Sequence, residues 1–133
     1  HGGATVREHI GWIGESASLA AEAGFDSMKA QIEEGLSKLT EATMYLAGSV
    51  GDPKSALAGA TPYLRLMAQV TGGAYMARAA VAAKAKVEAG DDPEYFAEVI
   101  ALSEFYIEQL MPQVFGLVPS ITAGAAPLFD IEL

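Results

Sequence analysis

The sequence has no cysteine and almost no histidine, and these absences exclude several kinds of chemistry. Without thiols the chain forms no disulfides and no thiolate metal sites, and it has no cysteine nucleophile. His1 and His9 are the only histidines. Nucleophilic catalysis usually needs a histidine base beside the nucleophile, and we expect His9 on the flank of a helix. A catalytic triad is therefore not expected.

Basic residues are also scarce, with 8 against 17 acidic residues and a formal charge of -9. This balance argues against nucleic acid and anionic membrane surfaces as partners. No run of about 20 residues is both strongly apolar and uncharged, so we expect no membrane span. Arg7, Glu8 and His9 interrupt the first apolar residues, so no signal peptide is expected. Together with the missing cysteine, this pattern favours a cytoplasmic protein.

Alternating β-branched runs are missing as well, and the sequence predicts an all-α fold. We expect one helical bundle domain over residues 1–133, a four-helix up-down bundle with short extra helices. The long helices are expected at about 4–23, 26–49, 61–88 and 93–111, a short helix at 53–58, and an irregular C-terminal tail at 119–133. In that tail, one more helical turn is expected before Ala126-Pro127.

The segment 61–88 is expected to be the central helix. Thr61 is predicted to cap it and Pro62 to occupy its first turn, while Gly90 marks its end. Its apolar residues share no single face, so we expect it to be enclosed on several sides. Gly72 and Gly73 lie in its middle, where each glycine costs about 1 kcal/mol relative to alanine. We therefore expect a neighbouring helix to cross closely at this point.

Two Asp-Pro pairs and a later proline mark other boundaries. Asp52 and Asp92 are each followed by proline, which predicts a cap and then a helix start. Pro112 is expected to kink or interrupt the last long helix. The core face of the 26–49 helix is predicted to end at Val50.

The chemistry-bearing residues predict no active site, so no catalytic, cofactor-binding or metal-binding residue is proposed. A carboxylate-bridged di-metal centre needs Glu-x-x-His on two helices, and the sequence has no such motif. The glutamates at 33, 34, 41, 98, 104 and 108 are expected on polar faces. Gly72-Gly73 lies within a helix and is not a phosphate loop. Arg65, Gln69 and Arg78 on the central helix serve either structural pairing or a ligand site.

Several segments carry a resemblance to a known family: Leu57–Leu66 (LAGATPYLRL), Val70–Gly73, Ala77–Ala79, Phe105–Tyr106, Leu110–Pro112 and Ile121–Ala125. With them, essentially the whole chain resembles the C-terminal extension domain of a bacterial branch of the acyl-CoA dehydrogenases. This branch includes 3-methylmercaptopropionyl-CoA dehydrogenase, and the domain is of the acetyl-CoA dehydrogenase-like C-terminal type. His1-Gly2-Gly3 resembles the double glycine at which the dehydrogenase core ends, so residues 1–3 are expected to be its remnant.

The resemblance implies that the chemistry lies elsewhere in a longer polypeptide. Enzymes of this family bind FAD and acyl-CoA, use a glutamate base, form oligomers and pass electrons to an electron-transfer flavoprotein. That glutamate lies upstream of the double glycine, so no catalytic residue is expected in this chain. The implied function is an accessory domain that packs on the dehydrogenase core. The alternative is a stand-alone helical module for protein–protein interaction.

A domain that packs on a core should expose an apolar surface when it is alone. Trp12, Leu19 and the pair Leu128-Phe129 are the candidates for this surface. We expect self-association through it.

Overall fold

The computed structural model describes residues 3–131, and regular structure in this range is helical throughout. The all-α prediction is confirmed. His1 and Gly2 of the expected core remnant lie outside the described residues. The helices are α1 (Ala4–Glu22), α2 (Asp26–Gly48), α3 (Pro53–Ala58), α4 (Ala60–Glu88), α5 (Pro93–Phe105), the π-helix η1 (Tyr106–Leu110), the 3-10 helix η2 (Met111–Leu117), α6 (Val118–Thr122) and α7 (Ala126–Phe129).

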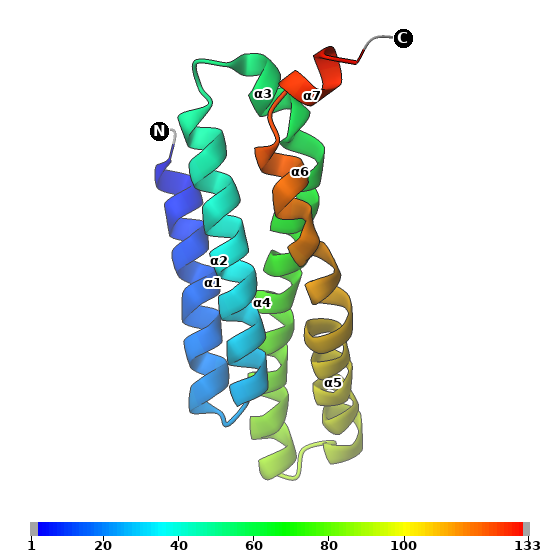
Figure 1. The fold of residues 1–133 in the computed structure, drawn as a ribbon. Helices are drawn as coiled ribbons and strands as arrows, with labels where there is room; N and C mark the ends of the chain where they lie inside the picture. Colours follow the sequence, from blue (N-terminus) through cyan, green and yellow to red (C-terminus); the bar gives the residue numbers. More distant parts are fainter. Residues whose placement is uncertain (1–2, 132–133) are drawn as a thin grey trace.

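The long helices lie side by side and alternate in direction along an elongated molecule (Figure 1). α4 is central: it packs against α1 and α2, and also against α5 and η2. η2 and α6 continue the direction of α5 and cover α2 and the first half of α4. α3 and α7 lie together at the end of the molecule where α1 begins (Figure 1).

α4 is buried along one broad side and open on the other. Its buried residues are Leu66, Val70, Gly73, Ala74, Ala77, Ala80 and Ala83. Leu64 and Tyr75, which were expected inside, are 65% and 63% exposed. The expectation of enclosure on several sides is confirmed where α4 meets α1, α2, α5 and η2, but the face that carries Leu64 and Tyr75 is open. The neighbouring helices leave this outer face largely uncovered, although Trp12 of α1 reaches Tyr75.

The expected helix caps are confirmed at one site of three. The Asp52 carboxylate accepts hydrogen bonds from the Ser55 amide at 3.3 Å and the Ser55 hydroxyl at 2.6 Å, and Pro53 follows it. Thr61 does not cap α4, which already begins at Ala60 because the Gly59 carbonyl accepts from the Tyr63 amide. Asp92 precedes α5 in a left-handed conformation, φ 44°, unlike the extended backbone usual at a helix cap, and its side chain makes no capping hydrogen bond.

The last long helix ends earlier than expected. α5 stops at Phe105, and a π turn and a 3-10 segment follow before α6. Pro112 has no N–H to donate to Glu108, so the regular helix cannot pass through it, and the predicted interruption is confirmed. In the tail, Gly124 adopts φ 74° and ends α6. The extra turn expected before Ala126-Pro127 is present as α6, and a further turn, α7, begins at Ala126.

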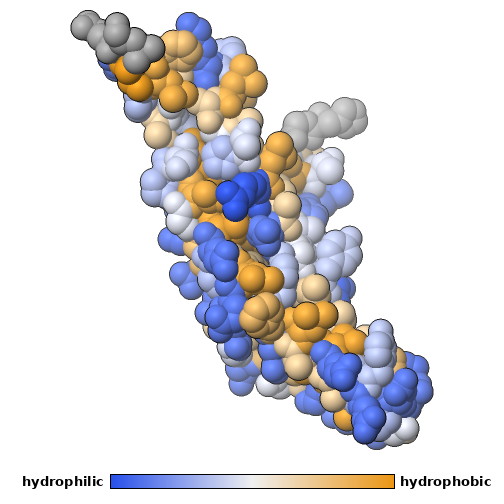
Figure 2. Space-filling model, turned by 90° about the vertical axis from the view of Figure 1, so that its right-hand side faces the viewer, coloured by the Kyte–Doolittle hydropathy of each residue, from blue (hydrophilic) through white to orange (hydrophobic). Residues whose placement is uncertain are grey.

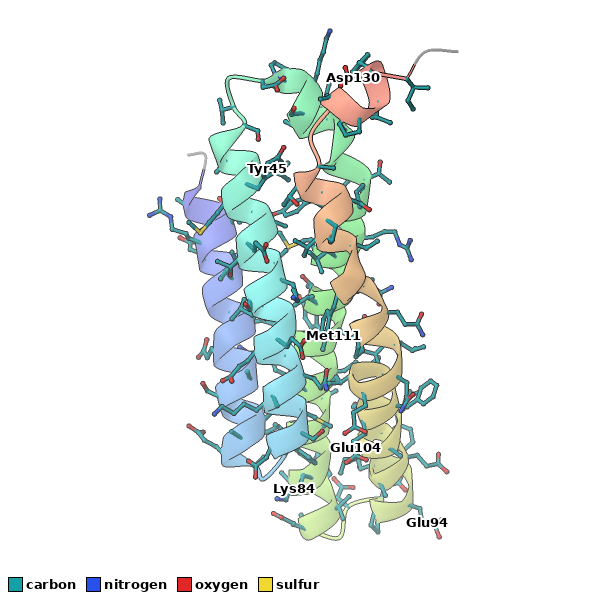
Figure 3. The ribbon with its side chains drawn as sticks, viewed as in Figure 1. Tyr45, Lys84, Glu94, Glu104, Met111 and Asp130 are labelled. Atoms are coloured by element: carbon teal, nitrogen blue, oxygen red, sulfur yellow. The ribbon has the colours of Figure 1, made fainter. Side chains whose placement is uncertain are left out.

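The interrupted segment lies close to its neighbours because glycines leave room for it. A Cβ atom on Gly72 would overlap the Tyr106 hydroxyl, and one on Gly73 would overlap the Met111 sulfur. In the same way Gly35 faces the Phe115 ring, and a Cβ on Gly59 would lie 2.6 Å from the Ile121 carbonyl oxygen. Figure 3 shows Met111 on the segment that runs beside α4. The close crossing predicted from Gly72-Gly73 is confirmed.

Alanine at Gly59 or Gly72 should destabilise the fold, although alanine is the better helix former. We expect a loss of about 1–3 kcal/mol in the free energy of unfolding, because the Ile121 backbone or the Tyr106 ring must move. Gly11→Ala in α1 is the matched control: its Cβ would meet nothing within 4 Å, so we expect a gain of up to about 1 kcal/mol. Urea unfolding curves measure all three variants. Equal gains at the three positions would contradict the close approach.

Candidate functional site

Large hydrophobic side chains are exposed mainly at the end of the molecule that carries the start of α1, α3 and α7. Seven of the twelve in the described chain belong to this end: Met44, Val50, Leu57, Leu64, Leu128, Phe129 and Ile131. Leu128 and Phe129 are 61% and 67% exposed, which confirms the predicted exposure of this pair. Val50 was expected on the core face of α2, but it is 81% exposed because α2 ends at Gly48.

A groove of about 730 Å³ opens at this end between α1, α2 and the start of α4. Its walls are Gly3, Val6, Arg7 and Ile10 of the first segment, Thr40, Thr43, Met44, Leu46, Ala47 and Val50 from α2 onward, and Tyr63 of α4. Most of this lining is apolar. The groove is therefore suited to the apolar side chains of another protein surface.

The polar groups of the groove already have partners within the chain. The Thr43 hydroxyl lies 2.7 Å from the Leu39 carbonyl oxygen and 2.7 Å from the Tyr63 hydroxyl. The Thr40 hydroxyl donates to the Leu36 carbonyl at 2.7 Å. Arg7 Nε donates to the Gly3 carbonyl at 3.4 Å. Because these groups are satisfied, the groove offers shape and apolar contact rather than reacting groups.

The surface beside the groove is held in place by a short chain of hydrogen bonds. Asp52 accepts from the Ser55 hydroxyl, and that hydroxyl oxygen accepts from the Ala125 amide at 3.1 Å. The hydrogen bonds from Ser55 hold the pKa of Asp52 below its ordinary value. Lys54 Nζ lies 4.9 Å from the centre of the Phe129 ring. These contacts tie α7 to α3, so the exposed Leu128 and Phe129 belong to an ordered surface.

Trp12 and Leu19 do not belong to this exposed surface, and their predicted exposure is wrong: both are half-buried. The Trp12 ring stacks with His9 at 5.8 Å and meets Tyr75 at 4.7 Å. The Arg78 guanidinium lies 4.6 Å from the centre of the Trp12 ring. Trp12 is therefore part of the contact between α1 and α4.

Two of the three polar residues considered on the central helix serve structural pairing. Arg78 Nε donates to the buried Ser16 hydroxyl at 2.7 Å, and its guanidinium lies 3.6 Å from the Glu15 carboxylate. Gln69 accepts from the Tyr106 hydroxyl, with its side-chain oxygen at 2.8 Å and its carbonyl oxygen at 2.9 Å. Arg65 is exposed.

The other residues considered for chemistry lie on the surface of the bundle. His9 lies on the flank of α1 as predicted, with Nε2 2.7 Å from the Thr71 hydroxyl. The six glutamates expected on polar faces are all exposed. Within residues 3–131, no three histidine, aspartate or glutamate side chains gather as metal ligands would. The same range contains no helix with the length and hydropathy of a membrane span.

The comparison with protein families gives one match, to the family described as acetyl-CoA dehydrogenase C-terminal like, over residues 8–132. The chain belongs to this family. The match covers every helix of the structure except the first turn of α1. No curated protein and no solved structure matches the chain. This membership confirms the resemblance that the sequence shows to the C-terminal domain of acyl-CoA dehydrogenases.

The groove is not among the predictions from the sequence, although the spacing of some of its residues indicates it. Thr40 and Ala47, seven residues apart, lie on one line beside the core face of α2. This second line is weakly apolar, so it is overshadowed by the stronger core line. The spacing of its residues would have indicated a further contact surface.

The Tyr106–Gln69 contact predicts a loss of stability at alkaline pH. Burial raises the pKa of Tyr106 above its ordinary value of 10.0. The neutral hydroxyl is thus favoured in the folded state, and its contribution is present below pH 10 and is lost as the pH rises through the folded-state pKa. Tyr106→Phe should therefore differ from the wild type more at pH 9 than at pH 11 in urea unfolding. Tyr95→Phe, at an exposed site, is the control; the same pH trend there would contradict the assignment.

Arg78→Ala should destabilise the contact between α1 and α4 by about 1–2 kcal/mol, because it removes both the bond to Ser16 and the cation–π contact with Trp12. Trp12 is the only tryptophan, so its fluorescence spectrum reports the change directly. Arg65→Ala, at an exposed position on the same helix, should change stability by less than about 0.5 kcal/mol. An unchanged tryptophan spectrum in Arg78→Ala would contradict this role.

Proposed function

We propose that this chain is the accessory C-terminal helical domain of an FAD-dependent acyl-CoA dehydrogenase, an enzyme that oxidises an acyl-CoA to the 2-enoyl-CoA. The observation that carries the proposal is the family match over residues 8–132. The domain's own contribution is packing: it binds the dehydrogenase core of the same polypeptide and shapes subunit contacts or the mouth of the substrate site.

The surface proposed to meet the core is the apolar end with its groove. A C-terminal domain is joined to the preceding domain through its own N-terminal side, and here α1 begins at the groove. Gly3, Val6 and Arg7 line it directly. Met44 and Val50, at 70% and 81% exposure, supply the apolar area that a core would cover. As the chain passes from the core into this domain, the groove end is therefore the part of the domain nearest to the core.

FAD and acyl-CoA are proposed to bind to the parent enzyme outside this chain. The residues of the groove do not fit a flavin, because the hydroxyls of Thr43 and Tyr63 are already bonded to each other. In this proposal the parent enzyme is cytoplasmic and homo-oligomeric and passes its electrons to an electron-transfer flavoprotein. The domain takes part in those steps only through the core.

The second candidate is a stand-alone helical interaction module, which the exposed apolar groove also supports. The gene distinguishes the two. A dehydrogenase core encoded in frame directly upstream of His1 supports the accessory domain, whereas a start codon there supports the module. The chain alone, mixed with FAD and an acyl-CoA, should show neither a flavin spectrum nor turnover; turnover would contradict the accessory role.

Docking of the groove on the core can be measured by cysteine labelling, since the chain has no cysteine of its own. Met44→Cys and Val50→Cys should react quickly with a maleimide in the 133-residue chain. In the complete dehydrogenase polypeptide the rate at both positions should fall by about tenfold or more, because only an undocked state exposes the thiols.

Glu22→Cys is the matched control for this labelling experiment. Glu22 is exposed at the other end of α1, far along the molecule from the groove. Its labelling rate should be similar in the chain and in the complete polypeptide. Equal rates at positions 44 and 50 in both forms would contradict the proposed docking surface. Peptide mass spectrometry separates the introduced thiols from those of the core.

A further inference from the structure

The charge of the chain is divided unevenly along the sequence. Residues 1–86 contain eight basic and eight acidic residues, whereas residues 87–133 contain nine acidic and no basic residues. The whole formal charge of -9 therefore belongs to the part of the chain that begins at the end of α4. Four of these acids, Glu94, Glu98, Glu104 and Glu108, lie on α5 and η1 and are exposed.

The same two elements also expose large apolar side chains. Tyr95, Leu102 and Phe105 are 55%, 60% and 53% exposed. Tyr95 and Leu102 are seven residues apart, two helical turns, and Phe105 follows Leu102 by three, so the three side chains form one stripe. This stripe, Tyr95–Leu102–Phe105, lies away from Ser103 and Ile107, the buried residues of α5 and η1, of which Ser103 contacts Met76 of α4. Figure 2 shows hydrophobic side chains running along this side of the molecule between hydrophilic ones.

Glu94, Glu98 and Glu108 lie on the side of the stripe, whereas helical spacing places Glu104 on another face. Glu98 lies one turn from both Tyr95 and Leu102, and Glu108 lies one turn from Phe105. In the described part of the chain, none of the four forms an ion pair; Glu108 accepts only the Ser27 hydroxyl at 2.8 Å. Figure 3 shows Glu94 and Glu104 at two heights along α5.

The spacing of these acids is unfavourable for the helix itself. Glu94 and Glu98 are an i,i+4 pair of like charge, and so are Glu104 and Glu108. Such pairs destabilise a helix in isolation. Their repulsion is relieved when cations approach from outside, and a surface that combines apolar and anionic groups gains most from a ligand that combines apolar and cationic groups.

We propose that α5 and η1 form a docking surface for a basic amphipathic helix of another protein, whose apolar residues cover the stripe and whose lysines or arginines pair with the flanking glutamates. This occupant follows from charge complementarity: on the side of the stripe, α5 and η1 carry three carboxylates outside any ion pair within residues 3–131, and the two elements have no lysine or arginine. Apolar anchors at helical spacing fit an apolar stripe of the same spacing.

The docking surface is separate from the apolar end proposed to meet a dehydrogenase core. The end carries Met44, Val50 and the groove, whereas the stripe lies along the side of α5. Its occupant is a second partner, and its test does not depend on the proposed function.

The test uses two fluorescein-labelled synthetic peptides of about 18 residues, or about five helical turns. In both peptides one helix face carries leucines at i, i+3 and i+7 with alanines beside them. The opposite face carries lysines in one peptide and glutamates in the other. Fluorescence anisotropy measures their binding to the 133-residue chain. We expect saturable binding of the lysine peptide, weakening between about 50 mM and 300 mM NaCl, and no binding of the glutamate peptide. Failure of the lysine peptide to bind would overturn the proposal.

Four pairs of substitutions, two of them controls, separate this surface from general attraction to an acidic protein. Glu94→Gln with Glu98→Gln should weaken binding by about fivefold or more, whereas Glu34→Gln with Glu41→Gln removes the same charge from α2 and should have little effect. Leu102→Ser with Phe105→Ser should weaken binding by about tenfold or more, whereas Met44→Ser with Val50→Ser should not.

All four pairs change exposed residues, and circular dichroism checks that each variant keeps its helices. Equal weakening by the α2 and α5 charge pairs would show attraction to net charge alone and would overturn the proposal. Unchanged binding in Leu102→Ser with Phe105→Ser would overturn it as well.

Discussion

The structure depends on the close approach of the C-terminal segment to the helices beneath it, which four glycines make possible. From Tyr106 to Ile121 the segment meets Gly72, Gly73, Gly35 and Gly59 in turn. Each glycine removes the Cβ that would hold a neighbour away. The bulky side chains of the segment then fill the space: Met111 and Ile121 are fully buried, and Phe115 packs against the core. The mid-helix glycines of α4, costly for an isolated helix, are offset by this packing.

The interruption at Pro112 and the glycine contacts serve the same geometry. A regular helix continuing from α5 would keep one face toward α4 throughout. The π turn and the 3-10 segment change that face, so that the segment after Leu110 covers α2 as well as α4. The core is therefore continuous from Ile13 of α1 to Ile121 of α6. Because the segment packs on one side of α4, the outer side, with Leu64 and Tyr75, stays open.

The sequence predicts the features whose signal is local. Helical spacing and the lack of alternating β-branched runs give the fold class, and Asp52-Pro53 gives one cap correctly. The sequence-based prediction fails where the structure is determined by a contact between residues that are distant in the sequence. Nothing near Thr61 indicates that the Gly59 carbonyl starts α4. Trp12 resembles a surface anchor until Tyr75 and Arg78, more than sixty residues away, are seen around it. The groove forms from three helices, and no single stretch contains it.

The distribution of charge and apolar surface bears on how such a domain works. At the groove end, hydroxyls are bonded internally and exposed side chains are mostly apolar, so contact there favours a permanent, closely packed partner. Along α5, apolar side chains alternate with unpaired carboxylates, so contact there is weakened by salt and suits a partner that dissociates. The two surfaces belong to different parts of the bundle, one to the end that carries α3 and α7 and the other to the side of α5 (Figure 1). A domain that is fixed to one protein by its end can thus present its side to another protein. Such a role depends on surface contacts and requires no catalytic group in the domain.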